Sequence, residues 1–254
     1  MTDATRVVVT GATSGLGRAM AGALVEAGAR VAVTSRSRRR AAEAARELGP
    51  LAAGFELDVR DERSVSTFVD DVYAHFGGID VLVNNAGIGM LTVNERFPAY
   101  VQPFWEVAPS GFRDVFETKV TGVFLVARAV VPRMLAAGAG RVVNISMSES
   151  TMTRPGNVPY GPSGAAIEAM TRIMAAELAD TPVTVNLLLP GGPTATGMVP
   201  DEIPDEFRAR LLDPGIMGPP IVWLTSEAAA GLRDARIVAS EFEDWLDRRS
   251  SNRS

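Results

Sequence analysis

The 254-residue sequence contains 46% hydrophobic and 22% charged residues, which is typical of a globular protein with a substantial core. A net charge of −5 argues against a nucleic-acid partner, because neutralising phosphates requires a basic surface. The absence of cysteine excludes disulfides and thiolate metal sites, and the single histidine, His75, cannot build a histidine-rich site. A magnesium site made of carboxylates stays open, but no Asp/Glu cluster indicates one, so we expect no bound metal.

Short apolar runs alternate with helical patterns along the chain. The runs are nearly continuous in apolar character, rich in β-branched residues and bounded by Gly, Pro or Asn, which predicts buried strands. The predicted strands cover residues 6–10, 30–34, 51–57, 79–84, 140–146 and 182–189. The predicted helices cover residues 16–28, 39–48, 64–76, 111–135 and the segment after Tyr160. This alternation predicts an α/β domain over residues 1–249 with a parallel sheet covered by helices on both faces.

No apolar export segment precedes the first strand, and no run approaches the eighteen or so apolar residues of a membrane span. We therefore expect a cytoplasmic protein without a membrane partner. At the other end, residues 237–249 predict a strand and a short amphipathic helix, and residues 250–254 predict a disordered tail.

Two long connections, 88–109 and 190–219, follow the carboxyl ends of predicted strands. Open α/β sheets bind ligands at that edge, so we expect both loops to shape a substrate site. The second loop predicts a short helix over 201–212. The large side chains of the first loop either line an apolar pocket or only pack the loop, and both interpretations stay open for Met90, Phe97, Tyr100, Phe104 and Trp105.

The segment TGATSGLG (10–17) joins the first strand to the first helix. Glycines at such a junction permit a tight turn and bring the backbone close to a pyrophosphate, whose charge lies at the helix N-terminus. The alternative is a turn without a ligand. At the end of the second strand, Ser35 and Arg36 stand where an acidic residue would bind a ribose 2′-hydroxyl. A guanidinium such as that of Arg36 matches the oxygens of a 2′-phosphate instead, which indicates NADP(H). Arg38–Arg40 are interpreted as a solvated first helical turn.

These motifs resemble the short-chain dehydrogenase/reductase family over nearly the whole chain. TGATSGLG matches its glycine motif, NNAG (84–87) its central-strand motif, RVVNIS (141–146) the strand before its catalytic serine, and PGG (190–192) the turn beside the nicotinamide. The resemblance implies a Rossmann-like, doubly wound sheet, a tyrosine acid/base, hydride transfer, and assembly as a homodimer or homotetramer. The implied cofactor-binding residues are Gly11, Thr13, Ser14, Gly15, Leu16, Gly17, Ser35, Arg36, Asp58, Val59, Asn85, Ala86, Gly87, Pro190 and Gly191.

The sequence departs from the family pattern around Tyr160, which matches the catalytic tyrosine. The lysine expected four residues later is Gly164, although glycine costs about 1 kcal/mol inside a helix. Three explanations stay open: lost activity, a need for space or water, or transfer of the cation to another residue. Lys119 occupies the family's asparagine position, so we propose that it places its ammonium near the gap above Gly164. The alternative is that Lys119 faces solvent or pairs with a carboxylate such as Glu117.

The family's serine position is occupied by Met147. A one-residue shift at the strand end would bring the Ser148 hydroxyl to the substrate oxygen and leave Met147 in an apolar wall; otherwise the site has no serine. The expected catalytic residues are Tyr160, Ser148 and Lys119. The expected function is an NADP(H)-dependent oxidoreductase acting on a largely apolar carbonyl or alcohol. The alternatives are a non-redox enzyme (cyclase, isomerase or dehydratase) on the same fold and an inactive NADP(H)-binding protein.

Overall fold

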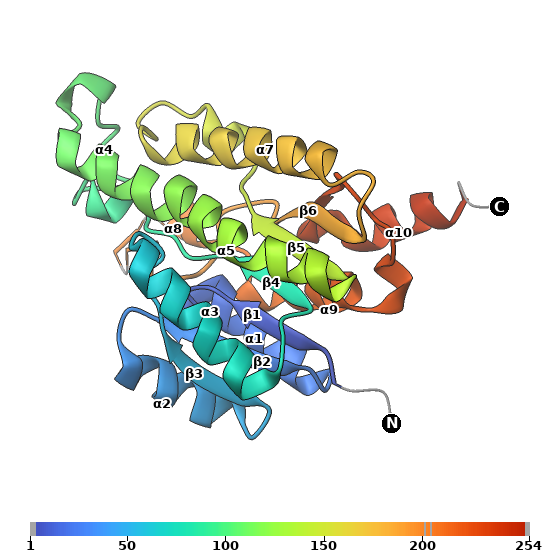
Figure 1. Ribbon diagram of the computed structural model, residues 1–254. Helices are drawn as coiled ribbons and strands as arrows, with labels where there is room; N and C mark the ends of the chain where they lie inside the picture. The colour runs from blue at the N-terminus through green and yellow to red at the C-terminus, as the bar shows by residue number, and fades with distance from the viewer. Residues whose placement is uncertain (1–3, 201, 204, 252–254) are drawn as a thin grey trace.

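The computed structural model describes residues 4–200, 202–203 and 205–251. Seven strands form one sheet in the order β3-β2-β1-β4-β5-β6-β7, and all neighbouring strands are parallel (Figure 1). The order reverses between β1 and β4, which places a ligand crevice at the carboxyl ends of these two strands. The predicted doubly wound parallel sheet is confirmed. The strands are β1 (Arg6–Val9), β2 (Arg30–Ser35), β3 (Ala52–Glu56), β4 (Val81–Asn84), β5 (Gly140–Ile145), β6 (Val183–Leu189) and β7 (Arg236–Val238).

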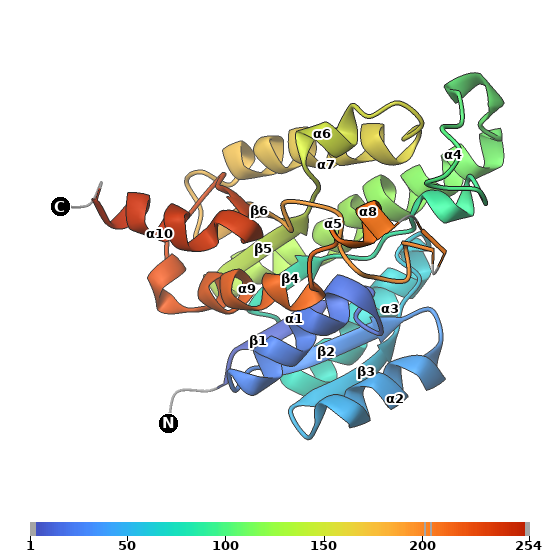
Figure 2. The same cartoon turned by 180° about the vertical axis from the view of Figure 1, so that it is seen from behind.

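Helices cover both faces of the sheet (Figures 1 and 2). Along β1, Val7 and Val9 pack into the layer of α1, α2, α9 and α10, whereas Val8 packs into the layer of α3, α5 and α7. Both faces are therefore buried, as the continuous apolar runs predict. The helices are α1 (Gly15–Glu26), α2 (Arg38–Leu48), α3 (Glu62–Phe76), α4 (Pro109–Phe116), α5 (Gly122–Ala137), α6 (Glu149–Met152), α7 (Tyr160–Glu177), α8 (Asp205–Arg208), α9 (Gly218–Thr225) and α10 (Phe242–Ser251).

The helix ends follow local sequence signals. Asp61 caps α3 by accepting a hydrogen bond from the backbone N–H of Ser64 at 2.9 Å, and Ser37 caps α2 in the same way through the N–H of Arg40. Gly77 and Gly138 end α3 and α5 in the left-handed region, with φ values of +78° and +75°. A side chain is strained in that conformation, so glycine is the suitable residue at both positions.

The predicted helix over 111–135 is two helices joined by a π-helical segment, Glu117–Thr121. The combined helix Pro109–Ala137 is long and apolar enough, by length and composition alone, to cross a membrane. One face of it, including Val126, Val130 and Met134, is buried against the sheet and α3, as in a core helix. The π segment carries Lys119 at its centre, and π segments occur frequently at functional sites.

Other elements differ from the sequence prediction in extent. The helix predicted over 201–212 is confined to Asp205–Arg208, with Asp201 and Pro204 outside the described residues. The short helices α6 and α9 were not predicted, because neither is long enough to show periodicity. The prediction of a disordered tail over 250–254 is wrong for Ser250 and Ser251, which complete α10, and residues 252–254 lie outside the described part.

Candidate active site

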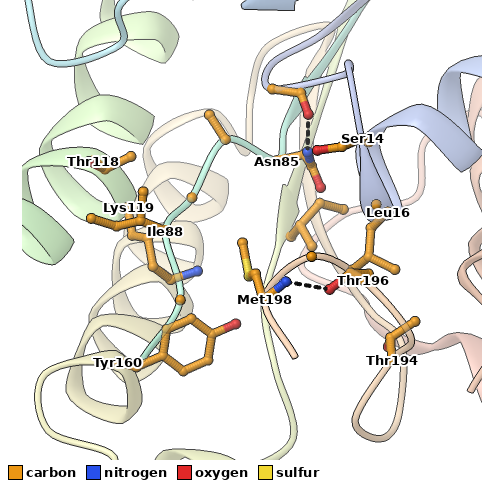
Figure 3. Close-up of a pocket in the computed structure, with 18 of the residues that line it drawn as sticks. Ser14, Leu16, Asn85, Ile88, Thr118, Lys119, Tyr160, Thr194, Thr196 and Met198 are labelled. Atoms are coloured by element: carbon orange, nitrogen blue, oxygen red, sulfur yellow. Dashed lines mark hydrogen bonds between the residues drawn. The ribbon is translucent and has the colours of Figure 1, made fainter. Parts of the chain in front are cut away.

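A cavity of about 780 Å³ opens at the carboxyl ends of β1, β2, β4, β5 and β6. The glycine loop and the end of β2 line one end of it, and Tyr160 and Lys119 line the other (Figure 3). The loop 190–219 reaches both ends: Thr196 lies beside the glycine loop, where a Cβ at Gly15 would be 3.2 Å from its side chain, and Met198 lies toward Tyr160. The three predicted catalytic residues all line it, and so does every predicted cofactor-binding residue except Gly191. Gly191 has a φ of +98°, and an added Cβ would lie 2.0 Å from Ser240 Oγ, so its place is in a tight turn behind the wall.

A partly buried hydrogen-bond network joins the segments that follow β1 and β4 at the base of the crevice. Thr10 Oγ1 accepts hydrogen bonds from the backbone N–H groups of Asn85 and Ala86 at 2.8 and 2.9 Å. The Asn85 amide donates to the carbonyl oxygens of Thr10 and Gly11 at 2.9 and 3.2 Å. These bonds satisfy backbone groups that the diverging strands leave unpaired, and they fix the glycine loop against the NNAG segment.

The glycine loop has the cradle that a pyrophosphate requires. A Cβ at Gly17 would lie 2.4 Å from Asn85 Nδ2 and 2.5 Å from the carbonyl oxygen of Gly11, so only glycine permits this close packing. Gly15 begins α1 with a φ of +54°, and the α1 N-terminus faces the cavity. The residues present therefore fit a dinucleotide phosphate group.

Guanidinium groups line the cavity near the ends of β2 and β3. Arg36, Arg40 and Arg60 line it, and Asp58 is the acidic residue among the lining residues. Arg60 donates two hydrogen bonds to the Asp58 carboxylate, at 2.7 and 3.0 Å, which holds the pKa of Asp58 below its usual value. The interpretation of Arg40 as only part of a solvated helical turn is wrong, because Arg40 lines the cavity. The sequence did not indicate Arg60 either, since nothing in its local pattern separates it from solvated surface arginines.

Lys119 and Tyr160 lie together at the opposite end. The Lys119 ammonium is 4.7 Å from the centroid of the Tyr160 ring, and both polar tips point into the cavity, facing Met198 (Figure 3). Lys119 is only 8% exposed, so the alternatives of a solvent-facing lysine or a pair with Glu117 are wrong. In the described part of the chain, no carboxylate pairs with it. Burial lowers the pKa of Lys119 to about 8 and raises that of Tyr160 above its usual 10.

The expected gap above Gly164 is filled. A Cβ added at Gly164 would lie 2.8–2.9 Å from Cγ, Sδ and Cε of Met147, whose side chain is 5% exposed. Of the explanation that Gly164 provides space or water, the space agrees with the structure, because Met147 occupies it, and the expected gap for water does not. Met147 and Gly164 pack as one unit, and a lysine at position 164 would require Met147 to change as well.

The serines near Tyr160 have partners of their own. Ser148 lines the cavity, and its hydroxyl is hydrogen-bonded to Thr151 Oγ1 at 2.9 Å and to Ser150 Oγ at 3.1 Å. Ser146 also lines the cavity, but it is buried and its hydroxyl donates to the Glu168 carboxylate at 3.0 Å. The Ser146 hydroxyl is thus held by a carboxylate, whereas the partners of the Ser148 hydroxyl are two neutral hydroxyl groups.

The substrate end has an apolar wall. Met90 and Phe97 line the cavity, whereas Phe104 and Trp105 lie outside it with 68% and 73% of their surfaces exposed. Tyr100 is also outside and donates a hydrogen bond to Glu106 at 2.8 Å. The loop 190–219 adds residues that the sequence did not single out, among them Thr194, Thr196, Met198 and Phe207.

The packing of Met147 on Gly164 predicts a coupled stability effect. Alanine in place of glycine in a helix interior normally raises the free energy of unfolding by about 1 kcal/mol. In the otherwise unchanged chain, Gly164→Ala is expected not to show this stabilisation, because Met147 must move. With Met147→Ala in place, the gain should return. Chemical denaturation of the four variants should give a coupling free energy of about 1–2 kcal/mol. Equal effects of Gly164→Ala in both backgrounds would contradict the packing argument.

The buried amine predicts a pH-dependent stability. The pKa of Lys119 is about 8 in the folded chain and 10.5 when unfolded, so the unfolded state binds more protons between these values and stability rises with pH across that window. Lys119→Met should therefore raise the free energy of unfolding at neutral pH, by up to about 3 kcal/mol. The advantage should shrink as the pH passes about 8, which denaturant titrations between about pH 7 and 9.5 would measure. Lys119→Arg, which retains a charge, should show no such advantage.

Comparison with known proteins identifies relatives over most of the chain. The family described as short chain dehydrogenase matches residues 5–206. The 3-oxoacyl-[acyl-carrier-protein] reductase of Vibrio harveyi is 33% identical over 232 residues, which cover 88% of this chain and 90% of the relative. The short chain dehydrogenase citE of Monascus ruber is 34% identical over 244 residues, which cover 92% of this chain and 80% of the relative.

Solved structures agree with this assignment. The 3-ketoacyl-(acyl-carrier-protein) reductase of Brucella melitensis, determined in complex with NADH, has a TM-score of 0.82 at 27% identity. The match covers 94% of this chain and 97% of that one. The sheet order, the glycine loop at the β1–β4 crevice and these matches together lead to one conclusion. This chain belongs to the short-chain dehydrogenase family of oxidoreductases.

Proposed function

We propose that the protein is an NADP(H)-dependent oxidoreductase that acts on the carbonyl or alcohol group of a small, largely apolar substrate. The observation that carries this proposal is that Tyr160 and Lys119 line the same cavity as the glycine loop and Arg36. One end of the cavity thus suits a phosphorylated dinucleotide, and the other presents an acid and a cation to a polar group.

The preference for NADP(H) rests on the charges near the end of β2. Arg36 is exposed at the cavity rim, follows Ser35 directly, and has Arg40 beside it in the lining. A 2′-phosphate would receive charge-assisted hydrogen bonds from these groups, which are stronger than hydrogen bonds between neutral partners. No carboxylate stands at position 35 or 36 to bind a ribose 2′-hydroxyl in its place.

When bound, the nicotinamide supplies or accepts the hydride. Tyr160 donates its phenolic proton to the carbonyl oxygen of the substrate, or accepts the proton of the alcohol in the reverse direction. The positive charge of Lys119 over the ring favours the phenolate and so opposes the effect of burial on Tyr160. Ser148 offers a second hydroxyl from the cavity wall, at the edge where the substrate oxygen would lie.

The substrate class follows from the apolar side chains at the Tyr160 end of the cavity. Met90, Phe97, Met147 and Met198 line that end of the cavity and provide adaptable apolar contacts.

The proposal includes a homodimer or homotetramer. Helices α4, α5 and α7 expose apolar side chains that a second copy would cover, namely Phe112, Phe124, Leu135 and Ile173, which are 39–59% exposed.

Arg36→Ala tests the cofactor assignment. Loss of a guanidinium–phosphate contact is expected to weaken NADPH binding about 10- to 100-fold and to leave NADH binding nearly unchanged. Calorimetric titration with each nucleotide would measure both. Arg38→Ala is the matched control, because Arg38 faces Glu56 at 3.9 Å and does not line the cavity. Equal weakening of NADPH and NADH by Arg36→Ala would refute the 2′-phosphate assignment.

Hydride transfer itself is tested with NADPH deuterated at C4 and a panel of small apolar ketones and aldehydes. Deuterium is expected at the carbinol carbon of the product. Tyr160→Phe should lower the rate by about 100-fold or more, since it removes the proton donor, and Lys119→Met should lower it in the same direction.

Ser148→Ala should have a smaller effect than Tyr160→Phe if Ser148 only assists the substrate oxygen. Product formation without deuterium, or turnover without any nucleotide, would reject the redox proposal. It would favour the non-redox alternative on the same fold.

A further inference from the structure

Lys119 is the only lysine in the sequence. The other 24 of its 25 basic Lys and Arg residues are arginine. An arginine side chain keeps its charge at every pH a protein meets, whereas an amine can lose its proton and become a nucleophile. The chain thus has one side-chain primary amine, and it lies in the cavity beside Tyr160.

The surroundings of this amine raise the fraction of its neutral form above that of an ordinary lysine. Lys119 is 8% exposed, and its close neighbours are the Tyr160 ring and the backbone at Gly87, where an added Cβ would lie 3.4 Å from Nζ. Across the described residues, no hydrogen-bond acceptor or carboxylate contacts Nζ, so the ammonium has the face of the Tyr160 ring but no paired anion. With a pKa of about 8, roughly a tenth of the molecules carry the free amine at neutral pH, against well under a thousandth for an ordinary lysine.

An acid stands next to the amine. Burial raises the pKa of Tyr160, so its phenol remains protonated at neutral pH. Figure 3 shows the Tyr160 hydroxyl and the Lys119 nitrogen directed into the same space. A carbonyl group held there would meet a nucleophile at carbon and a proton donor at oxygen, which is the arrangement that lysine-based covalent catalysis uses.

We propose that Lys119 forms an imine with a small aldehyde or ketone bound in this cavity. The nitrogen lone pair attacks the carbonyl carbon, and the oxygen takes the Tyr160 proton to give a carbinolamine. Nitrogen then returns one proton to Tyr160 and a second leaves with the hydroxyl group as water, while the C–O bond breaks and the C=N bond forms. The net change is one carbonyl and one amine converted into one imine and one water, with no oxidant or reductant.

This chemistry defines an activity beyond the proposed oxidoreductase and needs no nucleotide. The protonated imine withdraws electrons from the neighbouring carbon, so hydrogens on that carbon become acidic. The substrate class is therefore an aldehyde or ketone with a hydrogen on the carbon next to the carbonyl. The reaction class is proton exchange, isomerisation or elimination at that carbon, followed by hydrolysis of the imine.

The single lysine allows a sharp trapping experiment on the full chain without nucleotide. The probe is pentan-2-one with sodium cyanoborohydride, which reduces an imine to a stable secondary amine, and the readout is intact mass and peptide mapping. The N-terminal α-amine is an internal reference, because an α-amino group ordinarily has a pKa near 8. We expect the Lys119 peptide to be labelled at least ~10-fold faster than the N-terminus.

Variants separate the roles of the two residues. Tyr160→Phe should bring the labelling of Lys119 down toward that of the N-terminus, and Lys119→Arg should leave the N-terminus as the labelled amine. Labelling of Lys119 no faster than the N-terminus would overturn the proposal. An unchanged rate in Tyr160→Phe would overturn the acid role assigned to Tyr160. Lys119→Met, which removes the buried charge, provides a second unlabelled control if Lys119→Arg does not fold.

Catalysis is tested by proton exchange. In D₂O, the folded protein should exchange the hydrogens beside the carbonyl of pentan-2-one at least ~10-fold faster than Lys119→Arg does, as followed by NMR. Exchange at equal rates in the two proteins would contradict the proposed activity. Both experiments omit the nucleotide, so the imine proposal and the hydride-transfer proposal fail independently.

Discussion

The packing of Met147 against Gly164 governs the chemistry of this site. The thioether fills the volume above the glycine, where a side chain on α7 would otherwise reach toward the cavity. A cation therefore cannot come from the helix that carries Tyr160 without moving Met147. The amine comes instead from the opposite wall, through Lys119 on the π segment between α4 and α5. The unusual residues at 119, 147 and 164 are thus one spatial arrangement rather than three separate losses.

The energetics of Lys119 are unfavourable for a residue with only a structural role. Buried charges in proteins are normally paired, because an unpaired ammonium loses its hydration without compensation. Here the described residues provide an aromatic face but no carboxylate, and the lowered pKa reflects that deficit. Local departures of this kind concentrate at functional sites, where stability is given up for reactivity. The π segment adds a second departure at the same residue.

Much of the fold is predictable from the sequence because the signals are local and redundant. Continuous β-branched runs indicate strands buried on both faces, and Gly77 and Gly138 mark helix ends through their backbone freedom. The site is less predictable. The helical pattern runs through residues 117–121 without interruption, so it does not reveal the π segment. The contact of Met147 with Gly164 joins residues on a strand end and a helix, and only coordinates show it.

The charged residues at the cofactor end of the cavity are also only partly predictable from the sequence. Arg36 is distinguished by its place directly after β2, where the ribose of a dinucleotide would lie. Arg40 and Arg60 belong to the same cavity wall, yet in sequence they resemble the many arginines on the surface. Their grouping follows from the close approach of the segments after β2 and β3, which a linear pattern does not record.

One proton on Lys119 separates the two chemistries that this geometry supports. In the proposed hydride chemistry, Lys119 as an ammonium would favour the Tyr160 phenolate and assist proton transfer. In the proposed imine chemistry, Lys119 as a free amine would attack the carbonyl that Tyr160 protonates. An arginine at position 119 would serve the first role and exclude the second, because it does not deprotonate. The chain uses arginine at its 24 other Lys and Arg positions and keeps its one lysine at the position where losing a proton changes the reaction.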